Sequence, residues 1–292
     1  MTRKAAFAGQ FYEENEQELD KQITECFEDK NGPGALPLSK RSGKIQAIIA
    51  PHAGYTFSGP CAAWTYKAIA EAELADIYII IGPNHAGTGN AISMQGYETP
   101  FGIVRVDQEF SKSLLEKNTE LQIDEKAHEQ EHSIEVQIPF LQFATKDIAE
   151  DVHGNAVKIV PIIIHEIDYV KLGLDLKETI LECGKRVVII ISSDFTHYGH
   201  SYHYIPFSTD IKKNIYERDG KAIEFIKSLN ADGFIGYIDE TMGTVCGAFP
   251  IAVLLKTLKR AKVELLQYYT SADLEEDSAY KNSVSYAAIL FS

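Results

Sequence analysis

Three short apolar runs, each followed closely by a histidine, dominate the pattern of this chain. The runs span residues 45–50, 77–81 and 187–191, and the histidines are His52, His85 and His197. Continuous apolar runs of this length predict strands that are buried on both faces, which is typical of a parallel sheet. Ligands bind beyond the carboxyl ends of such strands. We therefore expect histidines that are far apart in sequence to meet in one crevice.

Helical and strand patterns alternate over the rest of the chain. Apolar residues at helical spacing predict helices at residues 14–28, 60–73, 108–116, 133–145, 169–183, 209–217, 220–229 and 247–260. Further strands are predicted at residues 91–94, 102–106, 156–165, 263–269 and 283–291. Pro139 is expected to kink its helix. The alternation predicts a three-layer α/β sandwich with a mostly buried central sheet flanked by helices. We expect residues 1–292 to form a single domain, because no repeat or linker divides them.

Charge and cysteine content narrow the functional classes. The formal net charge of −14 disfavours a nucleic-acid backbone as partner. The four cysteines form no C-x-x-C pair, and the chain starts without a signal-peptide pattern, so we expect free thiols in a reducing cytoplasm. No apolar run reaches the roughly 20 residues of a membrane-spanning helix, so no membrane partner is expected.

His52 and His85 are the strongest metal-ligand candidates, because glycine or proline fixes the turn around each. The alternative is a pair of ordinary loop histidines, but the repeated placement after a strand favours ligands. Asp194 precedes His197 by three residues. This pair could supply two ligands, or an aspartate that orients a proton-transferring histidine. The alternative is a polar turn that Asp194 caps.

Cys246 directly precedes an apolar helix, and a helix N-terminus stabilises a thiolate over a thiol. A thiolate binds metals or attacks electrophiles. One hypothesis is therefore a hydrolase with Cys246 as nucleophile and His197 as base. The alternative is a small buried residue, which is the usual role of a free cysteine.

The segment from His128 to His132 matches the H-E-x-x-H pattern of zinc proteases. A zincin helix is buried, whereas the intervening residues here are Glu, Gln and Glu. The composition favours an exposed loop or helix start, and we disfavour the protease interpretation. His132 and Glu135 are three residues apart and fall on nearly the same helical face.

Five motifs together resemble the Memo family (mediator of cell motility). They are Ala50-Pro51-His52-Ala53-Gly54-Tyr55, Gly82-Pro83-Asn84-His85, Glu131-His132-Ser133-Ile134-Glu135, Ser192-Ser193-Asp194-Phe195-Thr196-His197 and Val245-Cys246-Gly247. The arm at residues 8–12 and the ending at 283–288 fit as well, so the resemblance runs almost end to end. The chain is most similar to archaeal and bacterial members. These often accompany AMMECR-type and radical-SAM proteins, which the resemblance implies as partners.

The resemblance implies a fold similar to the LigB-type (class III) extradiol dioxygenases, a group of non-haem iron enzymes. Carried over by motif, His52 and His85 correspond to the two metal histidines, and Cys246 stands where a carboxylate ligand is expected. His197 corresponds to the acid–base residue, with Asp194 beside it.

His132 and Glu135 resemble further residues that line the cofactor pocket. A thiolate in place of a carboxylate makes a softer site, which suits Fe(II) first and also Cu or Zn. We therefore expect a metal-binding protein, with non-haem iron and oxidoreductase activity on a small molecule or peptide. The alternative is a non-catalytic module that binds a peptide or an anion in the vestigial cleft.

Overall fold

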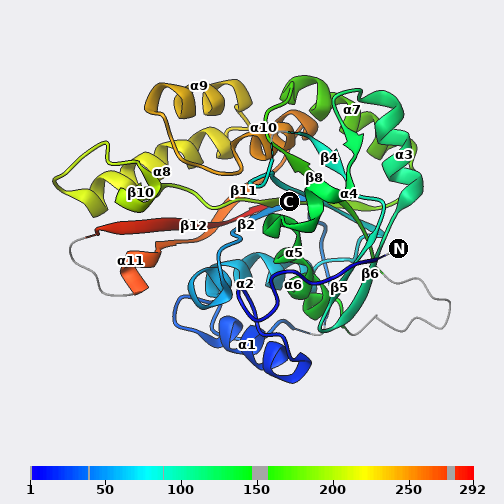
Figure 1. Ribbon diagram of the computed structural model, residues 1–292, viewed down its shortest axis with the longest axis horizontal. Coiled ribbons are helices and arrows are strands. Elements are labelled where there is room, and N and C mark those ends of the chain that lie inside the picture. Colours follow the sequence, from blue (N-terminus) through cyan, green and yellow to red (C-terminus); the bar gives the residue numbers. More distant parts are fainter. Residues whose placement is uncertain (1, 39, 88, 147–156, 275–279) are drawn as a thin grey trace.

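The apolar runs form the middle of one mixed sheet in the computed structural model, which describes residues 2–38, 40–87, 89–146, 157–274 and 280–292. Helices cover both faces of this sheet, so the predicted three-layer α/β sandwich is confirmed (Figure 1). The strands are β1 (Thr2–Arg3), β2 (Ala47–Ala50), β3 (Ile77–Pro83), β4 (Ala91–Ile92), β5 (Gly96–Thr99), β6 (Gly102–Val106), β7 (Gln122–Ile123), β8 (Lys158–Ile164), β9 (Val187–Ser192), β10 (His197–Gly199), β11 (Val263–Thr270) and β12 (Asn282–Phe291).

The helices alternate with these strands along much of the chain. They are α1 (Glu16–Glu28), α2 (Tyr55–Glu71), α3 (Gln108–Lys117), α4 (Glu125–Glu129), α5 (His132–Glu135), α6 (Gln137–Ala144), α7 (Tyr169–Glu182), the short 3₁₀ helix η2 (His200–Tyr202), α8 (Ile211–Lys227), α9 (Ala231–Thr241), α10 (Ala248–Thr257) and α11 (Ser271–Leu274). Among the described residues, no helix has the length and apolarity that crossing a membrane requires.

Parallel pairing in the middle of the sheet brings the ends of the three histidine-bearing strands together. The strand order is β1-β5-β6-β8-β3-β9-β2-β12-β10. Strands β6, β8, β3, β9 and β2 are parallel to one another, whereas β5 runs antiparallel to β6 and β12 runs antiparallel to β2. Since β2, β3 and β9 point the same way, their carboxyl ends lie along one edge of the sheet. The segments that follow them begin side by side.

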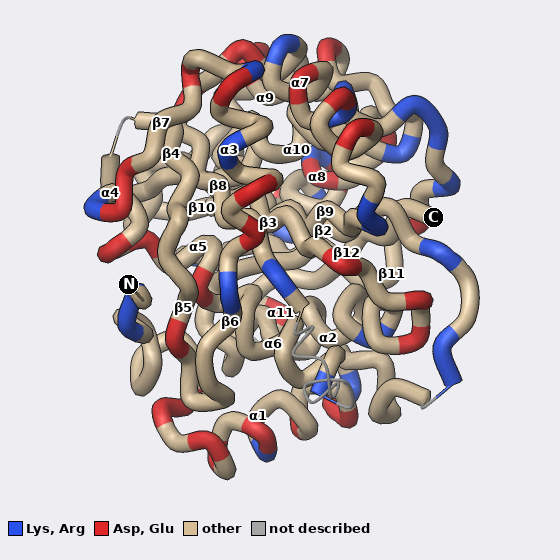
Figure 2. Tube along the Cα trace, turned by 90° about the vertical axis from the view of Figure 1, so that its right-hand side faces the viewer, with Lys and Arg blue, Asp and Glu red and all other residues tan. Residues whose placement is uncertain are grey.

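Alternate side chains of each central strand enter two different cores. Ile79 and Ile81 pack with the helices α3, α7, α9 and α10, whereas Ile80 packs with α1, α2 and α6 on the opposite face. Figure 1 shows these two sets of helices on opposite sides of the sheet. Charged segments lie mainly around the periphery, with basic and acidic positions interspersed (Figure 2). The central strands are apolar on both faces because both faces are covered.

Several predicted element boundaries need correction. Helix α2 begins at Tyr55 rather than at residue 60, and it contains Pro60. The predicted helix 133–145 is two helices that meet at Val136. The break falls just before Pro139, whose ring cannot pack against the carbonyl four residues earlier in a continuous helix. The strand predicted from residue 156 begins at Lys158, and residue 156 lies outside the described residues.

Two predicted helices, 209–217 and 220–229, form the single helix α8. Gly220 lies inside it, at a cost of about 1 kcal/mol relative to alanine. The buried side chains of Ile215, Ile223 and Ile226 hold this helix against the protein on both sides of the glycine. Helix packing therefore overrides the local preference of glycine for a turn.

Several short elements and the longer helix α9 were not predicted. Helix α9 carries buried Phe234, Tyr237 and Ile238 at helical spacing. Asn230 caps its N-terminus by accepting a hydrogen bond from the Gly233 N–H. The signal for α9 was therefore present in the sequence.

Substitution of Ile190 tests whether β9 lies in the core. It is fully buried in β9, so Ile190→Ala is expected to lower the free energy of unfolding by about 3 kcal/mol through lost burial and a cavity. Urea denaturation measures this change. The matched control is Leu181→Ala, because 74% of Leu181 is exposed, and we expect a change below about 0.5 kcal/mol there. Equal effects of the two substitutions would contradict the assignment of β9 to the core.

Candidate functional site

Ligand atoms from three distant parts of the chain converge at the carboxyl edge of the sheet. His52 lies two residues beyond β2, His85 lies two residues beyond β3, and Cys246 precedes α10. One ligand atom from each of the three residues lies within 4.8 Å of the other two. The Nε2 atom of His52 is 3.2 Å from the Cys246 Sγ atom. The structure thus brings together the three residues that the sequence nominated as metal ligands.

The Ser192 hydroxyl, whose one proton is already donated elsewhere, fixes the tautomer of His52. The Ser192 hydroxyl donates its one proton to the Ser133 carbonyl at 2.6 Å. It accepts a hydrogen bond from the side-chain amide of Gln137 at 2.8 Å, and this NH₂ group also donates to the Pro51 carbonyl. Ser192 can therefore only accept from the Nδ1 atom of His52, which lies 2.9 Å away. The proton is on Nδ1, and the lone pair of Nε2 faces Cys246.

His52 is neutral near pH 7. Burial lowers its pKa well below the usual value, and the neighbouring His132, His85 and His197 lower it further. A neutral imidazole with a free Nε2 lone pair is the form of histidine that binds a metal ion.

Cys246 and Asp194 are packed against each other. The backbone N–H of Asp194 donates to the Cys246 Sγ atom at 3.1 Å, and an Asp194 carboxylate oxygen accepts from the backbone N–H of His52 at 2.8 Å. Burial raises the pKa of the Cys246 thiol well above its usual value, and the negative charge of Asp194 raises it further. These effects outweigh the thiolate stabilisation that we expected from the N-terminus of α10. Burial also raises the pKa of Asp194, and the nearby His197 opposes that shift.

Glu131 orients His85 and was not assigned a role from the sequence. Its carboxylate accepts from the backbone N–H of His85 at 2.5 Å and lies 3.0 Å from the His85 Nδ1 atom. It also caps α5 by accepting from the Ser133 N–H. Burial raises the pKa of Glu131, but these hydrogen bonds and the charge of His85 dominate and lower it to about 2. Because an ionised carboxylate only accepts, His85 donates from Nδ1, and in the neutral imidazole the lone pair is then on Nε2. An acidic residue at a helix start beside a histidine was the available sequence signal.

His132 completes a cluster of imidazole rings. Its ring stacks on that of His85, with centroids 4.7 Å apart and an interplanar angle of 12°, and it meets His52 edge to face. Phe7 and Phe11 from the N-terminal arm pack against the same ring. Burial and the charge of His85 lower the pKa of His132 to about 4, so this ring is neutral as well.

Glu135 anchors the N-terminal arm and does not join the imidazole cluster. Its fully buried carboxylate pairs with Arg3 at 2.5 Å and accepts from the hydroxyl of Tyr12 at 2.7 Å. The backbone N–H groups of Ala6 and Phe7 also donate to it. The sequence could not reveal this role, because the partners lie more than 120 residues away. The arm that carries Phe7 and Phe11 is therefore fixed by Glu135.

His197 lies close enough to lower the pKa of both His52 and Asp194. Its Nδ1 atom is 2.9 Å from the Phe195 carbonyl and 3.1 Å from the Thr244 carbonyl. Since carbonyls only accept, Nδ1 carries the proton and Nε2 is free. This is the tautomer that a proton acceptor at Nε2 requires.

The H-E-x-x-H segment does not form a zincin site. It is divided between α4 and α5 rather than lying on one helix. His128 is buried, its Nδ1 atom contacts the Tyr97 hydroxyl at 2.7 Å, and its Nε2 atom contacts the Ala91 carbonyl. Both ring nitrogens are thus engaged within the core. The expectation that this segment is exposed is wrong for His128 and Glu131.

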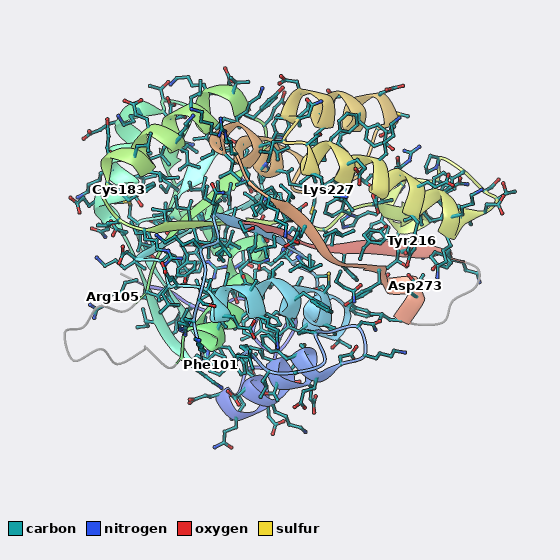
Figure 3. All side chains as sticks on the ribbon, turned by 180° about the vertical axis from the view of Figure 1, so that it is seen from behind. Phe101, Arg105, Cys183, Tyr216, Lys227 and Asp273 are labelled. Atoms are coloured by element: carbon teal, nitrogen blue, oxygen red, sulfur yellow. The ribbon has the colours of Figure 1, made fainter. Side chains whose placement is uncertain are left out.

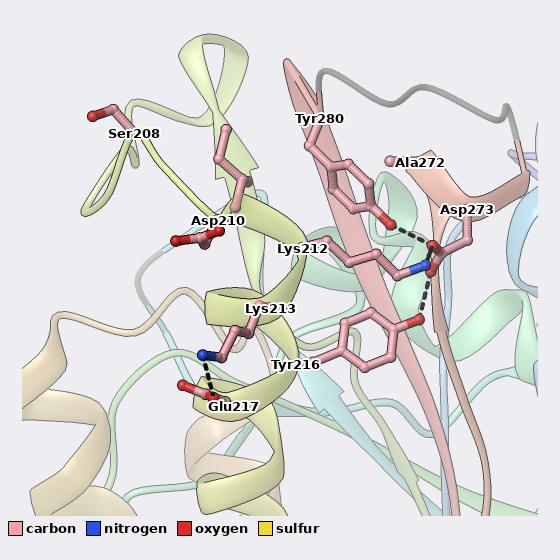
Figure 4. Close-up of a pocket in the computed structure, with 10 residues that line it drawn as sticks. Ser208, Asp210, Lys212, Lys213, Tyr216, Glu217, Ala272, Asp273 and Tyr280 are labelled. Carbon is pink, nitrogen blue, oxygen red and sulfur yellow. Dashed lines mark hydrogen bonds and ion pairs between the residues drawn. The ribbon is translucent and has the colours of Figure 1, made fainter.

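A separate cavity of about 1020 Å³ lies beside α8 and α11. Figure 4 shows Asp273 at its wall, where the carboxylate accepts from Lys212 and from the hydroxyls of Tyr216 and Tyr280. Figure 3 labels Tyr216 and Asp273 on one half of the molecule and Phe101 on the other. Burial opposes ionisation, but these donors lower the pKa of Asp273 well below its usual range. The cluster therefore ties α8 to the chain around α11.

By fold and site, this is an α/β protein with a histidine–cysteine cluster at the carboxyl edge of a parallel sheet. The sequence model of the Memo-like proteins matches residues 3–290. The chain belongs to the Memo-like protein family.

Archaeal relatives match over nearly their whole length. A MEMO1 family protein from Methanopyrus kandleri is 38% identical, and the match covers 100% of this chain and 99% of that protein. One from Pyrococcus furiosus is 36% identical, with 99% of each chain covered. An uncharacterized protein from Escherichia coli K12 shares the fold, with a TM-score of 0.56, 12% identity, and coverage of 85% of this chain and 100% of that one.

Arg3 tests the anchor of the N-terminal arm. Arg3→Ala leaves the buried Glu135 charge without its cation, so we expect a loss of about 3 kcal/mol of unfolding free energy. Urea denaturation measures the loss. Lys4→Ala is the neighbouring control, because the Lys4–Glu98 pair is exposed and is expected to contribute below about 1 kcal/mol. Similar losses in both variants would show that Arg3 is not an anchor.

Asp273 gives a pH-dependent prediction. Its pKa is lowered in the folded protein, so its contribution is present above the unfolded pKa of about 3.9 and is lost as the pH falls. We expect Asp273→Asn to be about 1–2 kcal/mol less stable than wild type at pH 7. The difference in unfolding free energy between wild type and Asp273→Asn should shrink as the pH falls below about 4. Denaturant unfolding at several pH values measures it, and a difference that stays constant would refute this role.

Proposed function

We propose that this protein binds one transition-metal ion through His52, His85 and Cys246 and uses it in redox chemistry on a small molecule. The observation that carries the proposal is the convergence of the three ligand atoms within 4.8 Å. Two imidazoles and one thiolate suit Fe(II), with Cu and Zn as the other candidates.

The hydrogen bonds around the site fit metal binding. His52 donates from Nδ1 to Ser192, and His85 donates from Nδ1 to Glu131, so both Nε2 lone pairs are available. Metal-binding histidines usually donate their other N–H to a carboxylate or another acceptor in this way. A cation would also favour the Cys246 thiolate and offset the effect of burial on the thiol.

Neutral imidazoles favour a metal over an anion. The lowered pKa values of His52 and His132 leave both rings uncharged near pH 7. An uncharged ring attracts a phosphate or carboxylate less than an imidazolium does. The charge state of the cluster therefore supports the metal proposal over the anion-binding module.

The surrounding residues have distinct tasks in this proposal. A bound iron ion would supply one-electron chemistry. Asp194 holds the His52 backbone and the Cys246 sulfur in place through its carboxylate and its N–H. His197 would accept or donate a proton at Nε2, because its Nδ1 proton is held by carbonyls. The His85 side chain is 36% exposed, which leaves the cluster open to a substrate from solvent.

Metal loading tests the proposal. After anaerobic incubation with Fe(II) and desalting, we expect wild type to retain about one equivalent. The His52→Ala/His85→Ala double variant should bind at least about tenfold more weakly. Metal analysis measures retention, and thermal unfolding provides a second readout, because a bound ion stabilises the folded state by mass action.

His165→Ala is the matched control. His165 directly follows β8 at the same edge of the sheet, yet it is exposed and belongs to neither described group of candidate ligands. It should leave metal retention unchanged. Equal metal content in wild type and the double variant would refute the site.

A further inference from the structure

We infer that His85, Glu131 and His132 form a second cation site, which takes a harder divalent ion such as Mn²⁺ and shares His85 with the first. The inference rests on the proposed function only through this shared residue. One ligand atom from each of the three residues lies within 4.8 Å of the other two. The set comprises two imidazoles and one carboxylate, with no sulfur.

Glu131 lies at the centre of this second set. Its Oε1 atom is 3.0 Å from the His85 Nδ1 atom and 3.5 Å from the His132 Nδ1 atom. Its side chain is fully buried, and the backbone N–H groups of His85 and Ser133 hold the carboxylate in position. The carboxylate thus lies between the Nδ1 atoms of two histidines.

The two donor sets differ in chemical softness. Two histidines and a carboxylate form the ligand set of many non-haem Fe(II) sites, and a carboxylate also suits Mn²⁺. The first set replaces the carboxylate with the Cys246 sulfur, which favours softer ions such as Cd²⁺. The nature of the ion therefore decides which set it enters.

Sharing of His85 makes the two sites mutually exclusive. His85 donates its Nδ1 proton to Glu131, so Nε2 is the atom free for the first set. An ion in the second set needs the Nδ1 lone pair, and the proton must then move to Nε2. That tautomer withdraws His85 from the first set. The stacked rings of His85 and His132, at 12°, would also have to open, because an imidazole lone pair lies in the ring plane.

Two probe ions separate the sites. Mn²⁺ binding is followed by loss of the free-ion electron paramagnetic resonance signal, and Cd²⁺ binding by the ultraviolet thiolate charge-transfer band. We expect His132→Ala and Glu131→Gln each to weaken Mn²⁺ binding about tenfold or more. His132→Ala should change Cd²⁺ binding little. Cys246→Ser should instead weaken Cd²⁺ binding and change Mn²⁺ binding little. His85→Ala should weaken both ions, and Cd²⁺ bound first should block Mn²⁺.

Cys183→Ser is the control for the thiol. Cys183, labelled in Figure 3, caps the end of α7. Its sulfur contacts the carbonyls of Ile180 and Lys185. The Cys183→Ser variant should bind both ions with the same affinity as wild type. Urea denaturation of each variant distinguishes a lost ligand from a lost fold, and His132→Ala provides a second route if Glu131→Gln unfolds the cap of α5.

Each result decides one of the proposals. Mn²⁺ binding that is absent in wild type, insensitive to His132→Ala, or lost in Cys246→Ser overturns the second site. Simultaneous binding of Mn²⁺ and Cd²⁺ overturns the sharing of His85. Cd²⁺ binding that is insensitive to Cys246→Ser overturns the first site and leaves the second standing.

Discussion

Parallel pairing of β2, β9 and β3 is the constraint on which the site depends. Because these strands run in the same direction, the segments that carry His52, Asp194 and His85 leave the sheet at one edge. The register pairs Ile191 of β9 with Ile49 of β2 and with Ile81 of β3, so the three strands end close to one another along this edge.

Buried polar contacts convert this placement into defined orientation. Ser192 and Glu131 each accept the Nδ1 proton of one histidine, and each is itself held by other donors or acceptors. An unpaired polar group in such a buried region would be costly, so these contacts reinforce one another. The two Nε2 lone pairs are thereby available before any ion arrives. This preorganisation is the physical basis of the proposed metal site.

The N-terminal arm contributes to the site from outside the sheet. Arg3 and Glu135 form a buried ion pair, and the carboxylate also accepts from Tyr12. The arm thereby places Phe7 and Phe11 against His132. A residue that resembled a pocket-lining group from its motif is thus a structural anchor. The acidic side chain of the same segment that reaches the imidazoles is Glu131, four residues earlier.

The sequence by itself determined the α/β class, the central strands and the nomination of His52, His85 and Cys246. Continuous apolar runs suffice for the class and the strands, because burial on both faces requires them. The nomination of the three ligands also drew on the chemistry of their side chains and on the motifs shared with the Memo family. Tertiary structure decided the roles of Glu131 and Glu135, the merging of two helices into α8 across Gly220, and the raised pKa of Cys246. Each of these depends on partners or packing from distant parts of the chain. Local patterns do not encode which buried donor will meet which carboxylate.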